Sequence, residues 1–108
     1  MIVYVDIGNS DDRLTQREWS DFIFAVQKIV DWTCFTLHGV RFSAPADPWQ
    51  NASWCVGFAD NPHGRSSALS LRAALARLAA DFHQNSIAWN QVNETEFIRP
   101  PNEGDSST

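Results

Sequence analysis

The chain has no long hydrophobic run. None of its stretches reaches the roughly 18–20 consecutive apolar residues that a membrane-spanning helix needs. The first residues, Ile2–Ile7, resemble a β-strand and lack the basic and then apolar pattern of an export signal. The sequence therefore predicts a soluble, cytoplasmic protein that does not associate with membranes.

Cysteine is scarce. The two cysteines, Cys34 and Cys55, lie in separate strand-like segments. If those segments form one hairpin about the loop near Asp47, Cys34 faces the region of Asp60 and lies far from Cys55. The sequence therefore predicts two buried thiols and no disulfide bond.

Basic residues are few. Eight lysine and arginine residues stand against thirteen aspartate and glutamate residues, which gives a formal net charge of -5 and a pI of about 4.9. The basic residues are scattered along the chain, and an acidic protein repels nucleic-acid phosphate unless a local basic patch offsets the repulsion. Nucleic acid is therefore not expected among the partners.

Motifs for catalysis and metal binding are also lacking. His38, His63 and His83 lie on three separate predicted elements, without a nucleophile setting, a zinc spacing or a P-loop. Several carboxylates could offer oxygen ligands to Mg²⁺, but no metal-binding spacing joins them. These carboxylates are Asp6, Asp11, Asp12, Glu94 and Glu96. The sequence predicts no catalytic residue, no metal site and no cofactor, and it favours a protein that is not an enzyme.

Hydrophobic residues, by contrast, are plentiful. They make up 44% of the chain and include seven phenylalanines and five tryptophans. Such a composition is typical of a folded globular domain with a substantial core. We expect a single α+β domain over residues 1–99 and a flexible polar tail over residues 100–108.

Two segments have the period of an amphipathic helix. In Ser66–His83 and in Leu14–Asp31, apolar residues recur at steps of three and four. The second of these segments begins with Thr15 and Glu18, which have the spacing of a capping box. The predicted buried faces are Ala68, Leu71, Leu75, Leu78, Ala79 and Phe82 in one helix and Trp19, Phe22, Ile23, Val26, Ile29 and Val30 in the other.

Four segments are strand-like. They are Ile2–Ile7, Thr33–Ser43, Ala52–Ala59 and Gln84–Gln91. The second changes phase, and a β-bulge at His38 and Gly39 would return its apolar residues to one face. The resulting order, β-α-β-β-α-β, is the ferredoxin-like pattern, with two helices on one face of a four-stranded antiparallel sheet. The alternative is another α+β sandwich with an extra C-terminal hairpin that includes Thr95–Ile98.

The ferredoxin-like order brings three polar connections to one end of the sheet. Amide side chains offer donors and acceptors, which suits recognition of a polar ligand or a peptide backbone. The candidate binding residues there are Asn9, Ser10, Asp11, Asp12, Trp49, Gln50, Asn51, Gln84 and Asn85. If Asn9 and Trp49 contact a ligand, changing both to alanine should leave the melting temperature nearly unchanged. The alternative is that these are turn and cap residues, present for local backbone reasons.

Two surface features of the predicted helices suggest further contacts. Phe24 lies off the buried stripe, beside Asp21 and Lys28, and is a candidate contact with a partner; the alternative is that it tucks under a loop. The reverse side of Ser66–His83 carries a strip of small residues that would allow close approach of the other helix or of a second subunit. The strip comprises Leu69, Ala73, Ala76 and Ala80. A homodimer through this strip or through an open sheet face is therefore one expectation.

The segment Val5–Ser10, VDIGNS, resembles the first phosphate loop of the actin-like kinase superfamily, notably of pantothenate kinases of the third type. The resemblance implies that Asp6 assists Mg²⁺ and that the loop amides hold phosphate. In that family a hairpin follows at once and two large domains close on the nucleotide. Here a capping box and a helix follow, and the chain is too short for two such domains. Kinase activity is therefore not expected, while a phosphate near Gly8–Ser10 stays open.

Three longer stretches, IGNSDDRLTQREW, APADPWQNASW and QNSIAW, together resemble small uncharacterised proteins of actinobacteria and their phages. Arginine outnumbers lysine seven to one, which fits a GC-rich genome. The resemblance implies no particular activity, but a phage protein of this size would be a host-directed binder or accessory factor. We predict a small non-enzymatic protein that binds a host protein. The alternative is a nucleotide- or phosphate-binding protein, with or without metal-dependent hydrolase activity.

Overall fold

The structure, a computed structural model, describes residues 1–9, 11–33, 36–44, 47–93 and 96–101. The elements are β1 (Ile2–Gly8), α1 (Gln16–Thr33), β2 (Thr36–Phe42), β3 (Asn51–Gly57), α2 (Pro62–Asp81) and β4 (Ala88–Gln91). The predictions for Ser10, for Cys34 and for the tail from residue 102 onward lie outside the described residues. Within the described ranges, neither helix is long and apolar enough to cross a membrane.

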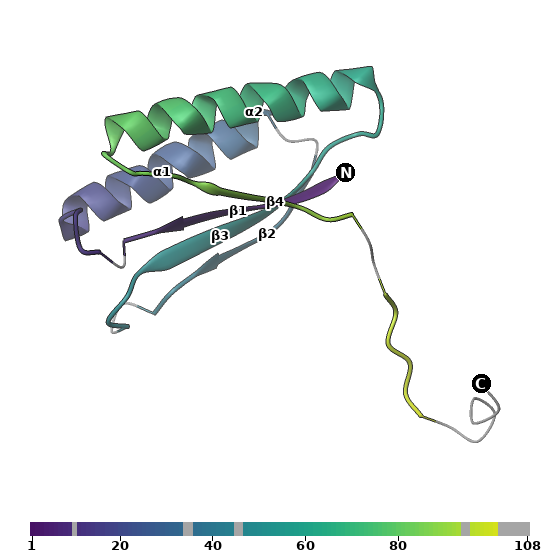
Figure 1. Ribbon diagram of the computed structural model, residues 1–108, viewed down its shortest axis with the longest axis horizontal. Coiled ribbons are helices and arrows are strands. Elements are labelled where there is room, and N and C mark those ends of the chain that lie inside the picture. Colours follow the sequence, from purple (N-terminus) through teal and green to yellow (C-terminus); the bar gives the residue numbers. More distant parts are fainter. Residues whose placement is uncertain (10, 34–35, 45–46, 94–95, 102–108) are drawn as a thin grey trace.

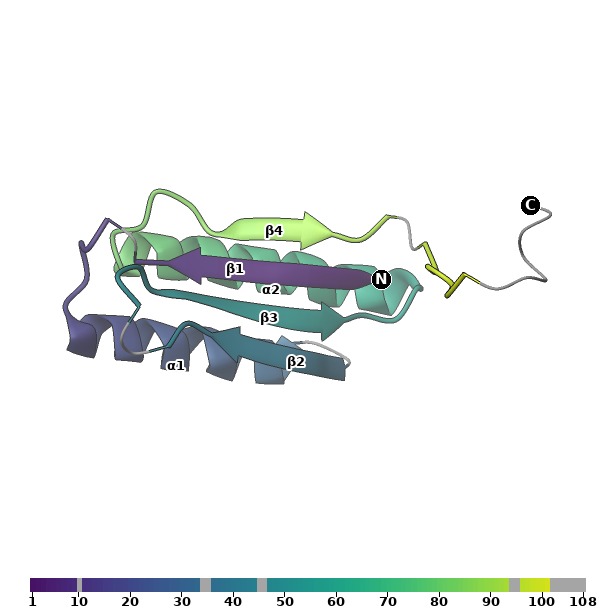
Figure 2. The same ribbon diagram turned by 90° about the horizontal axis from the view of Figure 1, so that it is seen from below.

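The four strands form one antiparallel sheet in the order β2-β3-β1-β4. Figures 1 and 2 show that both helices cover the same face of this sheet and that none of the described elements covers the opposite face. The predicted α+β architecture of two helices on a four-stranded antiparallel sheet is therefore confirmed. The strands β2 and β4 form its two edges, so among the described strands each pairs with one neighbour only.

The core lies between the sheet and the two helices. Val5 of β1 pairs with Trp54 of β3, and both side chains are completely buried on the helix side. The Trp54 indole Nε1 donates to Gln27 Oε1 of α1 at 2.7 Å, which satisfies the polar atom of this core side chain. The alternate positions of β3 face away from the helices, so Cys55 is a half-buried free thiol and the prediction that it is buried was wrong.

The predicted β-bulge in β2 is confirmed. Leu37 pairs with Val56 and Gly39 pairs with Cys55, so the register shifts at His38. After the shift, Val40 lies opposite Trp54 and Phe42 lies opposite Ala52. Because Trp54 and Ala52 are buried on the helix side, the bulge also directs Leu37, Val40 and Phe42 to that side.

Helix α1 begins with the predicted capping box. The Glu18 amide donates to Thr15 Oγ1 at 3.2 Å, and the Thr15 amide donates to Glu18 Oε1 at 2.9 Å. On either side of the box, Leu14 and Trp19 are both buried, as in a hydrophobic staple. The bond from the Thr15 amide stabilises the carboxylate, so it lowers the pKa of Glu18 below the usual range.

This capping box predicts a pH dependence of stability. Because the folded-state pKa of Glu18 is lowered, its contribution is present above the unfolded-state pKa and is lost as the pH falls below about 4. We expect Glu18→Gln to lower the melting temperature at pH 7 and to match the parent protein near pH 2.5. Thermal melts of both proteins across this range provide the test. A melting-temperature difference that stays constant with pH would contradict the assignment.

Helix α2 begins four residues before the predicted start at Ser66. Asn61 is the N-cap, since its Oδ1 accepts from the Gly64 amide at 2.8 Å, and Pro62 is the first helical residue. The prediction of a turn over Asp60–Gly64 was therefore wrong. Asn-Pro and His-Gly both favour turns, but Asn followed by Pro is equally a helix-start signal.

Helix α2 ends in a Schellman motif. The Gln84 amide donates to the Ala79 carbonyl at 2.7 Å, and the His83 amide donates to the Ala80 carbonyl at 3.2 Å. This geometry requires a left-handed residue after the cap, and His83 adopts it with φ 56°. Glycine usually occupies this position because it has no Cβ.

Replacing this histidine with glycine should stabilise the protein. We expect His83→Gly to add about 0.5–1 kcal/mol to the free energy of unfolding, because the left-handed strain disappears. Urea titrations of the parent protein and the variant provide the measurement. Asp81→Gly is the matched control, since it places glycine inside the last helical turn and should cost about 1 kcal/mol. Equal losses in both variants would refute the cap assignment.

The chain leaves the sheet after β4 and extends away from the body (Figures 1 and 2). Val92 still pairs through its amide with the Ile2 carbonyl at 2.9 Å. Residues 96–101 contain no helix or strand, so the described part of the predicted Thr95–Ile98 segment forms no further strand. We call the segment from residue 96 onward the tail. Two large apolar side chains in it are almost fully exposed, Phe97 at 82% and Ile98 at 91%.

Candidate binding groove beside β2

The three predicted polar connections do lie at one end of the sheet (Figure 1). The Asn9 amide donates to the Gln50 carbonyl at 2.8 Å, which ties the β1–α1 loop to the β2–β3 loop. The end of α2 reaches the same region, since the Phe82 ring stacks on Phe22 of α1 at a centroid distance of 4.8 Å. The end of the sheet is thus held together by contacts within the chain.

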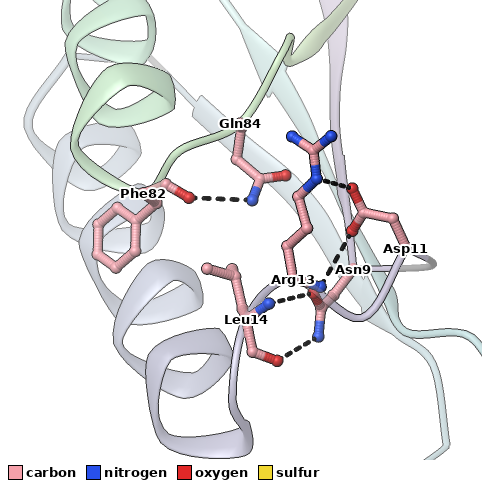
Figure 3. A network of polar contacts seen from close by, with 6 residues as sticks. All are labelled: Asn9, Asp11, Arg13, Leu14, Phe82 and Gln84. Carbon is pink, nitrogen blue, oxygen red and sulfur yellow. Dashed lines mark hydrogen bonds and ion pairs between the residues drawn. The ribbon is translucent and has the colours of Figure 1, made fainter.

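Asn9 is buried and fully bonded. Its Oδ1 accepts from the Leu14 amide, and its Nδ2 donates to the Leu14 carbonyl and to Gln50 Oε1, each at 3.0 Å. Figure 3 shows the side chain turned toward Leu14 at the start of α1. Only 3% of the residue is exposed. Alanine at this position is therefore expected to destabilise the protein, contrary to the expectation from sequence.

Gln50 and Gln16 form a reciprocal amide pair. Gln50 Nε2 donates to Gln16 Oε1 at 2.7 Å, and Gln16 Nε2 donates to Gln50 Oε1 at 3.1 Å. Together with Asn9 they form a cluster of three amides that fixes the β2–β3 loop against α1. The sequence analysis did not single out Gln16, because no local pattern links it to a loop 34 residues later.

The acidic residues of the β1–α1 loop face solvent. Arg13 Nε lies 3.1 Å from Asp11 Oδ2, and the Arg13 amide donates to Asp11 Oδ1 at 3.3 Å (Figure 3). Asp12 is exposed and adopts a left-handed conformation with φ 57°. Across the described part of the chain, no group of three or more histidine, cysteine, aspartate or glutamate side chains is placed to hold a metal ion.

A hollow of about 240 Å³ lies between α1 and the end of β2. On the α1 side, Trp19, Ser20 and Ile23 line it, and on the strand side Phe42 and Gln50 do so. The amide cluster around Gln50 borders it at the loop end. We call this hollow, together with the outer edge of β2, the β2 groove.

Two of the apolar residues of β2 that face the helices, Val40 and Phe42, are exposed. Phe42 is 52% exposed, although its ring makes an edge contact with buried Trp54 at a centroid distance of 6.0 Å. Val40 is also exposed, and no residue of β2 is fully buried. This exposure arises because β2 is an edge strand, so only one side of each side chain meets the body. An edge strand with uncovered apolar residues is a favoured place for another strand to pair.

Two of the predicted contact residues, Trp49 and Phe24, are near in sequence to residues that line the β2 groove. Trp49, 60% exposed, precedes Gln50 and Asn51, which both line the hollow. Phe24, 70% exposed, follows the lining residue Ser20 by one helical turn on α1. Both are exposed and lie close to the β2 groove along the chain.

The remaining predicted residues lie elsewhere. Gln84 and Asn85 line a different hollow, between α2 and β4. Gln84 Nε2 donates to the Phe82 carbonyl at 3.1 Å, a bond that closes the end of α2 (Figure 3). The predicted set of binding residues therefore forms no single site, because Gln50 and Asn51 lie beside β2 whereas Gln84 and Asn85 lie beside β4.

The comparisons with known proteins give no match, whether with protein-family models, with curated proteins or with solved structures.

Proposed function

We propose that the protein is a small non-enzymatic module that binds a protein partner, by pairing with an extended segment of that partner along β2. The observation that carries the proposal is the exposure of Val40 and Phe42 on the helix side of an edge strand. A strand added beside β2 would use the backbone groups of its free edge. Every second side chain of that strand would point toward α1 and cover the exposed apolar residues.

The β2 groove favours a particular kind of segment. The hollow beside Ile23 and Phe42 has room for one apolar side chain, and the amides at its loop end can bond to backbone groups. On the uncovered face, β2 carries His38 and Arg41 and no acidic residue, although the chain as a whole is acidic. We therefore expect a segment in which an apolar residue alternates with an acidic one.

We also infer that the fold is of the ferredoxin-like kind. The element order β-α-β-β-α-β and the strand order β2-β3-β1-β4 support this inference. The resemblance to small proteins of actinobacteria and their phages suggests that the partner is a host protein. Neither inference is needed for the strand-pairing proposal, which depends only on the exposed edge.

The phosphate-binding alternative receives less support from the β1–α1 loop. Several amides that could hold a phosphate donate within the chain instead. The Asn9 amide donates to the Gln50 carbonyl, that of Asp12 to the Asn9 carbonyl, and that of Leu14 to Asn9 Oδ1. A phosphate would have to replace these bonds, at a cost in stability.

A displayed library of random twelve-residue peptides tests the proposed function. Peptides selected on the parent protein should alternate apolar and acidic residues, and should bind Phe42→Asp at least tenfold more weakly. Trp32→Asp is the matched control, because Trp32 is also largely exposed but lies near the start of α2. Hydrogen exchange should slow at the β2 amides when peptide is bound. Peptides that bind Phe42→Asp with unchanged affinity, or that protect other segments only, would overturn the proposal.

A further inference from the structure

The second edge of the sheet also has an uncovered apolar groove. It runs between α2 and β4 and consists of two adjoining hollows of about 470 Å³ and 280 Å³. Arg72 and Trp89 line both hollows, and the Arg72 guanidinium lies over the Trp89 ring, 5.4 Å from its centroid. We call this the α2–β4 groove.

The α2–β4 groove is hollow for two reasons. Helix α2 has 20 residues and β4 only four, so the strand covers a small part of that side of the helix. In addition, the helix lines the larger hollow with Ala76, Ala79 and Ala80, which leave space that longer side chains would fill. Leu69, in the smaller hollow, is 65% exposed. This side of the core is therefore incomplete within the described chain.

The tail carries exposed apolar side chains that could fill the α2–β4 groove. Phe97 and Ile98 are the two most exposed apolar residues in the tail, and the chain that carries them leaves the body directly beside the groove, which Gln91 lines. Isolated exposed apolar residues are common, but an aromatic and a β-branched residue side by side have high strand propensity. Figures 1 and 2 show residues 96–101 directed away from the body of the same chain.

The charges of the tail and of α2 are complementary. Within a chain of net charge -5, α2 carries three arginines and one aspartate. The sequence from residue 96 onward carries three acidic residues and one arginine. Arg65 lies 3.8 Å from Asp60, whereas Arg72 lies over Trp89 inside the groove. The sequence from residue 96 onward, with a net charge of -2, would therefore be attracted to α2, with a net charge of +2.

We propose that the α2–β4 groove is filled by the tail of a second copy of the chain, so that two copies exchange tails and form a symmetric dimer. Residues 96–99 of one copy pair with the free edge of β4 in the other. Since successive side chains of a strand point to opposite faces, Phe97 enters the groove beside Trp89 and Leu69. Ile98 then covers Val92 and Ile2, which are exposed on the uncovered face.

The exchange is reciprocal, so the assembly closes at two copies. Each tail starts beside its own groove, which places the two grooves close together across the two-fold axis. The β2 groove lies at the opposite edge of the sheet and stays accessible. The dimer is thus independent of the proposed partner binding.

Sedimentation of the full chain tests the proposed dimer. We expect the parent protein to have twice its chain mass of 12.2 kDa at tens of micromolar. Phe97→Ala combined with Ile98→Ala should raise the dimer dissociation constant at least tenfold without a change in circular dichroism, because both side chains are exposed in the single chain. Phe24, a phenylalanine that is 70% exposed, lies outside the proposed interface, so Phe24→Ala should leave the dimer intact.

A mixing experiment establishes whether the tail acts between copies. Leu69→Glu places a charge in the α2–β4 groove but leaves the tail unchanged. The double alanine variant has an unchanged groove but lacks the Phe97 and Ile98 side chains that would fill it. Each variant alone should be monomeric, and their mixture should form a heterodimer through the one remaining intact contact. A parent protein that is monomeric would overturn the proposal, including the case in which its tail folds back on its own groove. An unchanged dimer dissociation constant in the double alanine variant would also overturn it.

Discussion

Replacing Gly64 with alanine is expected to lower the free energy of unfolding by about 3 kcal/mol or more. A Cβ on Gly64 would lie 1.7 Å from the Ala59 carbonyl oxygen and 2.6 Å from its carbon. These are backbone atoms, so no side-chain rotation relieves the overlap, and the start of α2 would have to move away from the end of β3. For a domain of this size, such a loss corresponds to a drop of roughly 15 °C in melting temperature.

The loss of stability expected for Gly64→Ala is opposite in sign to the usual effect of this substitution in a helix. Gly64 lies inside the first turn of α2, where glycine-to-alanine changes normally stabilise a helix by about 1 kcal/mol. Gly39→Ala is the matched control, because a Cβ there meets no atom within 4 Å and the backbone is not left-handed. It should change stability by less than about 0.5 kcal/mol. A Gly64→Ala protein that melts at or above the parent temperature would refute the close packing of α2 on Ala59.

The second large effect is expected for Asn9→Asp, at about 3 kcal/mol of destabilisation at pH 7. The change is nearly isosteric, but it replaces the Nδ2 donor with an oxygen. That oxygen would face the Leu14 carbonyl and Gln50 Oε1, both 3.0 Å away, and a negative charge would be placed in a site that is 3% exposed.

The pH dependence of the stability of Asn9→Asp distinguishes the effect of the buried charge from the effect of the altered side-chain shape. Burial beside two oxygens raises the folded-state pKa of the introduced carboxyl group, because the charged form is disfavoured. The penalty relative to the parent protein is therefore complete above that raised pKa, and it decreases as the pH falls toward about 4, the unfolded-state value. Asp11→Asn, a change of the opposite kind at an exposed position two residues later, should be nearly neutral. Denaturant titrations of the three proteins at pH 4 and pH 7 would measure this. Equal stability of parent and Asn9→Asp at pH 7 would contradict the buried position.

Much of the fold follows from local patterns in the chain. The period of α1, its capping box at Thr15 and the phase change at His38 each depend on residues that are near in sequence, so they could be recognised without a structure. The start of α2 was misplaced because Asn61-Pro62 is both a turn signal and a cap signal. The decisive fact is the close approach of Gly64 to the backbone of Ala59, five residues earlier, which depends on how the chain turns from β3 into α2.

The candidate sites were harder to predict, since they depend on what leaves a surface uncovered. Asn9 has a polar amide side chain in a loop, which is typical of a binding residue. Its hydrogen bonds with Leu14 and Gln50 instead give it a structural role. Phe42 has the pattern of a core residue, yet its place on an edge strand leaves it exposed. Sequence indicates which side of a strand a residue faces, but whether anything covers that side depends on the order of strands in the sheet.

The two unequal edges of the sheet also determine how copies of the protein could aggregate. If β2 of one copy paired with β4 of the next, each addition would present a new edge, and the assembly would grow into an open filament. The β-bulge at His38 bends one edge, and the four-residue length of β4 leaves few backbone groups on the other. A reciprocal exchange of tails would occupy the β4 edge in every copy. Growth would then stop at two chains, and truncation before Phe97 should allow fibres to form slowly.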